Sequence, residues 1–336
     1  MSNFAALETF LYPFQDLFNR DGVAEISINR PGEVWVEQKG DMYCESIPSI
    51  DIDHLKSLGR LIAQSTDQTI SEETPLLSAT LPNGFRIQIV FPPACEPGTV
   101  AMSIRKGATV QYTLDTYEKI GAFDTTTIEE VIDESTATLI NLLKEKKIKE
   151  FLSTAVKTKK NLIVSGGTST GKTTFTNALL LEIPSDERLI TCEDAREINL
   201  SQHKNRIHLI ASKGGQGRAK VSIQDLIEAC LRLRPDRIIV GELRGAEAFS
   251  FLRAINTGHP GSISTLHADT PNMALEQLKL MVMQAGLGMP PAEIKNYITA
   301  VIDIVVQLKR AAKGKRYISE VYFKGMNDST NSLKES

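Results

Sequence analysis

The chain has 336 residues, which is longer than one typical domain, so we expect two domains. Its apolar fraction of 41% and charged fraction of 24% are ordinary for a globular protein with a buried core, which excludes a disordered chain. The net charge of −3 excludes a surface built as a whole to neutralise nucleic acid.

The cysteines and the N-terminus indicate a compartment. Cys44, Cys95, Cys192 and Cys230 lack the spacing of zinc ligands or of a disulfide framework, so we expect buried thiols in a reducing compartment. The N-terminal sequence MSNFAALETFLYPFQDLF lacks the charged start and apolar centre of a leader peptide, and no window is apolar enough to span a membrane. We predict a cytoplasmic protein whose contact with a membrane is peripheral.

The first part of the chain, residues 1–104, alternates strand-like runs with turns. VAEISINRPGEVWVEQKGDMY is typical of a hairpin that turns at Pro31-Gly32, and SATLPNGFRIQIVFPPA of one that turns at Asn83-Gly84. Between them, DIDHLKSLGRLIAQST has leucines and isoleucine at helical spacing. We therefore predict an N-terminal α+β domain.

The pattern changes after residue 104. Residues 105–127 have no sustained period and are predicted to be a linker. From 128 to 325, helices alternate with buried strands in the βαβ pattern of a parallel sheet, and the polar end MNDSTNSLKES, residues 326–336, is expected to be a flexible tail. The predicted strands are 162–165, 188–192, 206–210, 237–240, 262–266 and 302–308.

The stretch SGGTSTGKTT lies between the first of these strands and a helix, and it matches the P-loop pattern that binds nucleotide phosphates. Its backbone N–H groups would surround the phosphates, aided by the positive end of the helix that begins at Lys172. We expect Lys172 to reach the β- and γ-phosphates of ATP and the Thr173 hydroxyl to bind Mg²⁺. The predicted nucleotide-binding residues are Gly166, Gly167, Thr168, Ser169, Thr170, Gly171, Lys172, Thr173 and Thr174.

Two more strands end in carboxylates at the sheet edge where open α/β folds bind ligands. RLITCEDAREI ends in Glu193 and Asp194, and PDRIIVGELRGAEA ends in Glu242, whereas Asp236 precedes its strand at the wrong end. A carboxylate at this edge can hold Mg²⁺ or orient the attacking water. We predict Glu193 and Glu242 as catalytic residues and, with Thr173, as metal ligands. Charges that merely favour a helix start remain an alternative for Glu193, Asp194 and Glu242.

The stretch TGHPGSISTLHADT adds a histidine at the same edge. His267 ends a strand of small residues, and Thr270 and Pro271 are typical of the start of the next helix. His267 is a catalytic candidate that can sense or polarise the γ-phosphate, although a structural histidine bonded to a backbone carbonyl is the alternative. For His259, between a glycine and a proline, we favour the structural role.

Together, GGTSTGKTT, CEDAREI, PDRIIVGELRGAEA and GSISTLHADT resemble the motifs of the secretion ATPase superfamily, whose members power type IV secretion, type II secretion and type IV pilus extension or retraction. LPNGFRIQIVFPPA and VAMSIRK resemble the paired-arginine segments of the type IV secretion traffic ATPases. The resemblance implies an α/β fold, with a C-terminal RecA-like P-loop NTPase domain and a smaller N-terminal α+β domain, assembled as a hexameric ring. It also implies that nucleotide lies between the domains and that Arg86 and Arg105 reach its phosphates as catalytic residues, either in cis or across subunits.

The chain also departs from that family. Relatives commonly have Gly-Ser where this chain has Ser169-Thr170, which affects the geometry of the loop rather than phosphate binding. The four-cysteine insert of many type II secretion ATPases is missing and the N-terminal domain is short, which favours the type IV secretion branch. Arg196 and Arg244, each close behind an acidic strand end, are further candidates for catalysis or for sensing a neighbouring subunit.

The implied function is a magnesium-dependent ATPase motor whose domain motions drive substrate export or pilus assembly, with inner-membrane components of a secretion machine as partners. A pilus retraction or type II secretion motor is the nearest alternative, and a nucleotide-dependent binding switch with little hydrolysis is another. A small-molecule kinase would need an acceptor pocket and an arginine-bearing lid, which no segment indicates.

Two basic stretches remain. KEKKIKEFLSTAVKTKK holds seven lysines against two glutamates, and KRAAKGKR is typical of a charged turn between the last two strands. We expect both to be solvated surfaces, with attraction to anionic lipid as the alternative. No motif for reading DNA bases is present, so sequence-specific nucleic-acid binding is not expected, and the residues do not indicate whether the cargo is DNA, protein or pilin.

Overall fold

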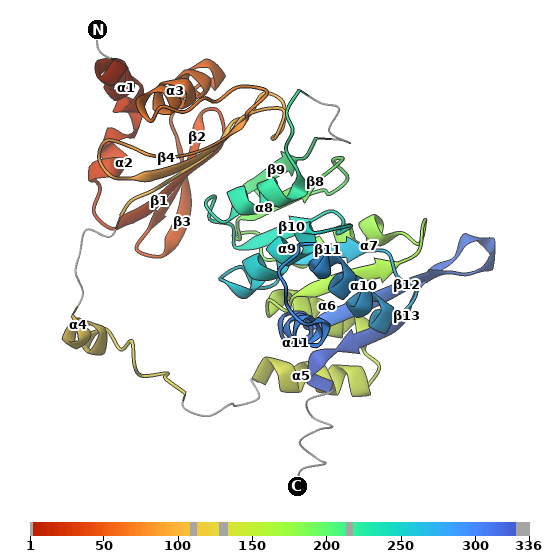
Figure 1. The fold of residues 1–336 in the computed structure, drawn as a ribbon. Coiled ribbons are helices and arrows are strands. Elements are labelled where there is room, and N and C mark those ends of the chain that lie inside the picture. The colour runs from red at the N-terminus through yellow and green to blue at the C-terminus, as the bar shows by residue number, and fades with distance from the viewer. Residues whose placement is uncertain (1–2, 108–112, 128–133, 213–217, 327–336) are drawn as a thin grey trace.

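The computed structural model describes residues 3–107, 113–127, 134–212 and 218–326. These residues form two β-sheets, each with its own helices, and a short helical segment that lies away from both (Figure 1). The N-terminal sheet and the C-terminal sheet belong to separate parts of the chain, which are joined by the segment around residue 115.

The N-terminal sheet has six antiparallel strands in the order β3-β2-β1-β6-β5-β4. Both predicted hairpins are present, because β1 pairs with β2 around Pro31-Gly32 and β4 pairs with β5 around Asn83-Gly84. The helix predicted between them is also present, and the Asp51 side chain caps it by accepting a 2.7 Å hydrogen bond from the backbone N–H of His54. The elements are α1 (Asn3–Leu11), α2 (Gln15–Asn19), β1 (Val23–Arg30), β2 (Glu33–Gln38), β3 (Asp41–Ser46), α3 (Ile52–Ser65), β4 (Leu76–Thr80), β5 (Arg86–Val90) and β6 (Ala101–Arg105).

The segment predicted as a linker contains one helix that the sequence pattern did not indicate, α4 (Leu114–Lys119). Thr113 caps it by accepting a hydrogen bond from the N–H of Thr116. None of the residues of α4 is buried, so no apolar face packs on a core and no helical period arises. A local cap, rather than burial, defines this helix.

The C-terminal sheet has seven strands in the order β13-β12-β7-β11-β10-β8-β9, and only β13 runs antiparallel to its neighbour. All six predicted strands are present, with ends that differ by no more than two residues. Because β7, β8, β10 and β11 are parallel, their carboxyl ends meet at one edge. The strands are β7 (Leu162–Gly166), β8 (Leu189–Glu193), β9 (Arg206–Ile210), β10 (Arg237–Val240), β11 (Ile263–Leu266), β12 (Ile304–Arg310) and β13 (Arg316–Phe323).

Helices cover both faces of this sheet (Figure 1). A capping box begins α8, with Ser222 and Asp225 bonded to each other's backbone N–H, and Thr270 caps α10 ahead of Pro271. One core forms against α8 (Ile223–Cys230), α9 (Glu247–Asn256), α10 (Pro271–Met283) and α11 (Pro291–Val301), and the other against α5 (Glu134–Lys144), α6 (Ile148–Lys157) and α7 (Lys172–Leu180).

The two parts of the chain are joined through buried groups. The backbone N–H of Ile210 donates to the carbonyl of Ala94 at 2.9 Å, so the segment after β5 covers the edge strand β9. The Arg188 guanidinium, fully buried immediately before β8, donates to Asn29 Oδ1 of β1 at 2.7 Å and also to Asn205. Burial lowers the pKa of Arg188 to about 10, and these amide oxygens stabilise its charge.

Among the described helices, none has the length and apolar character that a membrane crossing requires. Three cysteines are buried as expected, but Cys44 is exposed on β3, so the expectation of four buried thiols is wrong. Cys44 lies on the outermost strand of the N-terminal sheet, which has only one neighbouring strand. The expected flexible tail from residue 327 onward lies outside the described residues.

Candidate functional site

The P-loop joins β7 to α7, and its backbone conformation depends on glycines. Gly171 has φ of +90° and precedes the first helical residue, Lys172. A Cβ atom at Gly166 would lie 2.6 Å from Thr170 Oγ1 and 2.9 Å from the carbonyl oxygen of Leu308, so only glycine fits there. Ser169 has φ of 62°, a left-handed conformation that usually favours glycine. The departure from the family pattern therefore falls on a position where the loop needs that conformation.

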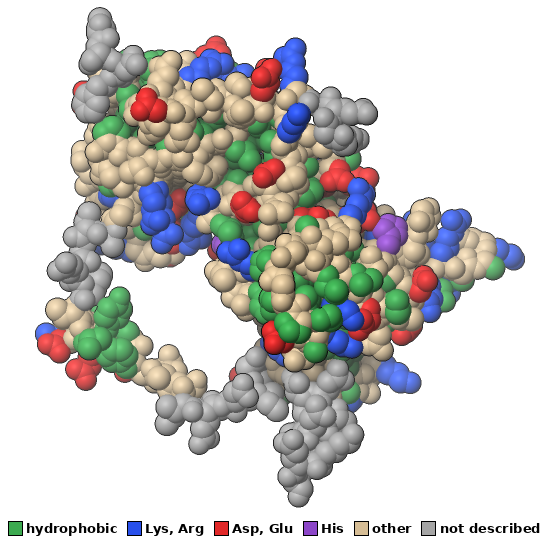
Figure 2. Space-filling view, viewed as in Figure 1, with side chains coloured by type: hydrophobic (Ala, Val, Ile, Leu, Met, Phe, Trp, Pro, Cys, Tyr) green, Lys and Arg blue, Asp and Glu red, His purple; other side chains and the backbone are tan. Residues whose placement is uncertain are grey.

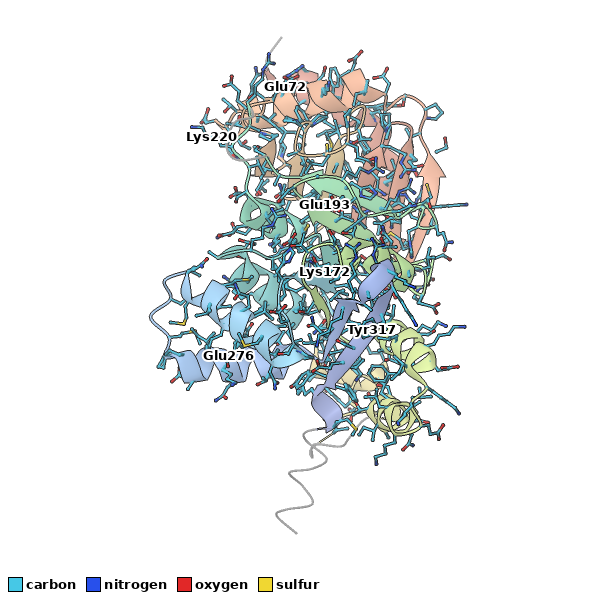
Figure 3. All side chains as sticks on the ribbon, turned by 90° about the vertical axis from the view of Figure 1, so that its right-hand side faces the viewer. Glu72, Lys172, Glu193, Lys220, Glu276 and Tyr317 are labelled. Atoms are coloured by element: carbon cyan, nitrogen blue, oxygen red, sulfur yellow. The ribbon has the colours of Figure 1, made fainter. Side chains whose placement is uncertain are left out.

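A cavity of about 500 Å³ opens beside this loop. Figure 3 labels two residues that line it, Lys172 at the start of α7 and Glu193 at the end of β8, and shows them near each other at the middle of the molecule. Its lining brings together seven predicted nucleotide-binding residues and three predicted catalytic residues. They are Thr168, Ser169, Thr170, Gly171, Lys172, Thr173, Thr174, Glu193, Glu242 and His267, with Asp194, Glu197, Arg244 and Arg316 among the others.

Lys172 lies at the centre of a polar cluster. Its Nζ donates to the carbonyl oxygens of Gly166 at 3.0 Å and Gly167 at 3.4 Å, and it lies 3.3 Å from the ring nitrogens of His267. Partial burial lowers the pKa of Lys172, an effect that the charge of Glu242 opposes. The Lys172 ammonium therefore lies beside the P-loop backbone, close to His267 and Glu242, which follow two other strands.

Glu242 lies where side chains that follow β8, β10 and β11 meet. His267 Nε2 lies 3.0 Å from Oε1 of Glu242, and Arg244 Nη2 donates to Oε2 at 2.9 Å. Arg244 also forms an ion pair with Asp194, so it bridges the two acidic strand ends. The hydrogen bond to Glu242 raises the pKa of Arg244 above its ordinary value. Glu242 remains partly exposed to the cavity, with 21% of its side chain accessible.

Glu193 is placed at the predicted sheet edge but is used differently. Its side chain is only 2% exposed, and Oε1 accepts hydrogen bonds from the backbone N–H groups of Glu197 at 2.9 Å and Ile198 at 2.8 Å. Its Oε2 accepts from Thr191 Oγ1 at 2.9 Å and lies 3.7 Å from Nδ1 of His208. Burial acts to raise the pKa of Glu193, but His208 and these hydrogen bonds outweigh it and hold the pKa below its ordinary value.

Glu197 is a candidate that sequence reasoning missed. Its Oε2 accepts a 3.1 Å hydrogen bond from Thr173 Oγ1, the hydroxyl expected to bind Mg²⁺. Its backbone carbonyl also accepts from Asn177 Nδ2 of α7 at 3.2 Å, so the acidic loop is tied to the P-loop helix. The available signal was its position in the same motif, CEDAREI, four residues after Glu193.

The donor set fits a nucleotide with its metal ion. Mg²⁺ is commonly bound by one or two carboxylates and a hydroxyl together with phosphate oxygens, and Thr173, Glu197 and Glu242 supply those protein groups here. Within residues 3–326, excluding the undescribed gaps, no cluster of three or more acidic, histidine or cysteine side chains is arranged to hold a metal by itself. The thiols Cys95, Cys192 and Cys230 lie in the cores rather than in this cavity.

Arg86 and Arg105 lie away from the P-loop cavity of their own chain. They occupy opposite positions on β5 and β6, where both are exposed. Both line a second cleft, of about 720 Å³, between the N-terminal sheet and the C-terminal part, together with Arg232 and Arg234. Lys and Arg side chains gather on that edge of the N-terminal part in Figure 2. Within one chain, the structure does not bring these arginines to Lys172.

The remaining candidates divide between the cavity and the scaffold. Arg244 lines the cavity, whereas Arg196 forms an ion pair with Glu96 of the N-terminal part. Asp236 accepts a 2.6 Å hydrogen bond from the N–H of Arg188 at the opposite end of the sheet, and His259 Nδ1 lies 2.8 Å from the carbonyl oxygen of Pro235. Burial lowers the pKa of His259, which fits a neutral structural histidine.

Comparisons with known proteins identify the family to which this chain is similar. A family model described as "Type II/IV secretion system protein" matches residues 12–334. The chain is 38% identical to the type IV secretion system protein VirB11 of Bartonella quintana over 338 residues, covering 95% of this chain and 93% of that protein. It is 39% identical to the type IV secretion system protein PtlH of Bordetella pertussis over 328 residues, covering 95% and 96%.

A solved structure is similar over almost the whole chain. The VirB11 ATPase from the Brucella suis type IV secretion system, crystallised in complex with sulphate, matches with a TM-score of 0.91 and 37% identity, covering 98% of each chain. This match confirms the predicted fold class, an α/β fold with a C-terminal RecA-like domain and a smaller N-terminal α+β domain.

Proposed function

Because the chain belongs to the family of type II/IV secretion system proteins, we propose that it is an ATP-hydrolysing motor of a type IV secretion system. The observation that carries this proposal is the cavity in which Lys172, Glu242 and His267 meet beside the P-loop. The relatives named as type IV secretion proteins match 95% of the chain and support this branch over the type II motors.

Nucleotide binding rests on the loop from Gly166 to Thr174. Its backbone N–H groups surround the phosphates, and Lys172 exchanges its bonds to the loop carbonyls for bonds to the β- and γ-phosphates. Thr173 would hold Mg²⁺, which would neutralise charge that develops on the phosphates. A hydroxyl can offer a lone pair to a metal while its O–H donates, so Thr173 can keep its hydrogen bond to Glu197, whose carboxylate then orients that hydroxyl.

Hydrolysis rests on Glu242. Its carboxylate faces the cavity and accepts from Arg244, and His267 contacts both it and Lys172. Glu242 orients the water that attacks the γ-phosphate, and His267 links that carboxylate to the lysine that holds the phosphate. Glu193 has both oxygens engaged by protein groups, so we revise its proposed role from catalyst and metal ligand to support of the acidic loop.

Arg86 and Arg105 act across a subunit boundary in this proposal. They are exposed, they lie side by side, and they line a cleft different from the P-loop cavity of their own chain. A guanidinium supplied by a neighbour neutralises the γ-phosphate in the transition state. The proposal therefore includes a homohexameric ring in which these arginines serve the nucleotide of the adjacent subunit.

The proposed motor action depends on the two domains of the chain and the linker between them. We propose that residues 1–104 and 128–325 move relative to each other about the linker 105–127 as nucleotide is bound and hydrolysed. The protein is cytoplasmic and in peripheral contact with the membrane, and it passes the work to inner-membrane components of the secretion machine.

Lysines of the basic stretch from residue 144 to 160 partly pair with Glu145, Glu182 and Glu187, which favours a solvated surface over a lipid site there.

ATP turnover tests the proposal. The purified protein is expected to hydrolyse ATP in the presence of Mg²⁺, and Lys172→Ala is expected to abolish both binding and turnover, whereas Lys220→Ala, distant from the cavity, changes neither. Retained turnover in Lys172→Ala contradicts the proposed site. ATP binding without turnover in the wild-type protein favours the alternative of a nucleotide-dependent switch.

Light scattering after size-exclusion chromatography tests the ring. A mass near six protomers with a non-hydrolysable ATP analogue is expected, and a strict monomer both with and without the analogue contradicts the hexamer.

A further inference from the structure

The hairpin of β12 and β13 brings a charged residue to the P-loop from the far end of the chain. Strand β12 runs parallel to β7, with Leu308 opposite Gly166, and it continues beyond the sheet edge before β13 returns. Figure 3 shows this hairpin, on which Tyr317 is labelled, beside Lys172. Arg316, the first residue of β13, lies next to Tyr317 at the returning end of the turn.

Arg316 packs directly on the P-loop backbone. Its Cδ, Nε and Cζ atoms lie 2.9, 3.4 and 3.7 Å from the position that a Cβ atom at Gly171 would occupy. It also lines the P-loop cavity, and within the described residues it is the one lining residue from the chain beyond His267. The lack of a side chain at Gly171 thus serves two purposes, the positive φ of the loop and the approach of this guanidinium.

The charge of Arg316 has no carboxylate partner within 4.0 Å among the described residues, whereas Lys309 on the same hairpin pairs with Glu320 at 3.5 Å. An arginine fork matches phosphate geometry through two parallel hydrogen bonds. An exposed guanidinium that lines the phosphate-binding cavity and has no carboxylate within ion-pair distance among the described residues is suited to bind an anion there.

The position of Arg316 indicates which phosphates it reaches. Lys172 Nζ, together with His267 and Glu242, marks the end of the cavity where the terminal phosphate reacts. In P-loops, the backbone N–H groups hold the inner phosphates, and Gly171 is part of that backbone. Resting on the nucleotide binding proposed above, we propose that Arg316 binds the phosphates that ADP and ATP share, and so acts as an affinity residue supplied by the C-terminal hairpin.

Calorimetric titration of the full chain with ADP, with a non-hydrolysable ATP analogue and with inorganic pyrophosphate tests this inference. Arg316→Ala is expected to weaken all three by a similar factor, roughly 10-fold or more, because a charge-assisted hydrogen bond pair is lost. Arg316→Lys is expected to recover only part of the affinity, since an ammonium cannot form the fork. Arg310→Ala, on the same hairpin but outside the cavity, is the matched control and is expected to bind as wild type.

The outcomes separate this inference from the proposed function. If the wild-type protein binds nucleotide and Lys172→Ala does not, but Arg316→Ala binds as wild type, the role of Arg316 is overturned and the proposed function stands. A loss for ADP without a loss for pyrophosphate also overturns the phosphate contact, because the guanidinium would then act on the ribose or base. If the wild-type protein binds none of the three ligands, the proposed function and this inference both fail.

Discussion

His267 Nε2 lies 3.0 Å from Oε1 of Glu242, although the two residues come from different strands and are separated by 25 positions. They meet because β10 and β11 are adjacent and parallel, with Val240 opposite Ser264, so both strands end at the same edge. Arg244 occupies the other oxygen of Glu242, which leaves the carboxylate in one orientation facing the cavity. An oriented carboxylate beside the P-loop lysine is the arrangement that in-line attack of water requires.

Glu242→Gln is expected to lower kcat for ATP hydrolysis by at least about 100-fold, since a positioned general base contributes on that order. The affinity for ATP should change little, because Lys172 and the loop backbone remain. Steady-state turnover combined with fluorescence titration of a labelled nucleotide measures both quantities. Glu228→Gln, an exposed site on α8, is the control, and a Glu242→Gln protein with wild-type turnover would exclude Glu242 as the base.

Glu197→Gln tests the metal side of the site. The substitution keeps the hydrogen bond from Thr173 but removes a negative charge beside the expected Mg²⁺ position. We expect the Mg²⁺ concentration for half-maximal turnover to rise by roughly 10-fold, as for groups that orient metal ligands. Thermal stability should stay as in wild type, because this side chain is exposed. An unchanged Mg²⁺ dependence would show that Glu197 takes no part in metal binding.

In contrast to Glu197→Gln, a substitution of Glu193 is expected to change the stability of the fold. Its pKa in the folded protein is held below the ordinary value of 4.5, so the ionised carboxylate stabilises the fold above that pH and this contribution is lost as the pH falls through the folded pKa. Glu193→Gln should therefore lower the free energy of unfolding near pH 7 by about 1–3 kcal/mol and reduce the loss of stability on acidification. Urea denaturation at several pH values measures this difference. Identical pH profiles for the two proteins would refute the role in holding the acidic loop.

The contrast between these carboxylates shows what the sequence could predict. Lys172, Glu242 and His267 each end a strand or begin a helix within one short motif, and parallel strand order brings those ends together. The role of Glu193 depends on Thr191 and His208. His208 is placed by the pairing of β8 with β9, which the residues of the motif do not predict. The sequence predicts only a charged turn around Arg316, because the contact of Arg316 with Gly171 depends on the register of β12 against β7.

Thiol reactivity tests the distribution of buried and exposed cysteines. Cys44 is exposed, whereas Cys95, Cys192 and Cys230 are buried, and burial raises the pKa of the Cys95 thiol to about 11. A chromogenic disulfide reagent is expected to modify one thiol quickly in the native protein and the rest only after unfolding. Cys44→Ser should remove the fast phase. A fast-reacting thiol that remains in this variant would contradict the burial of the other three cysteines.

Ser169 tests how much strain the P-loop tolerates. Its φ of 62° places a residue with a Cβ in the left-handed region, at a cost of roughly 1–2 kcal/mol. Ser169→Gly removes that strain but adds freedom to the unfolded chain, so the free energy of unfolding should change by less than about 1 kcal/mol. Ser169→Val places a β-branched residue in the same region, where it is a strong outlier, and should lower both the melting temperature and the affinity for ADP. Calorimetry on the two variants and wild type measures this, with Ser185→Val in the exposed turn before β8 as the control. If valine is tolerated as well as glycine, position 169 does not need the left-handed conformation.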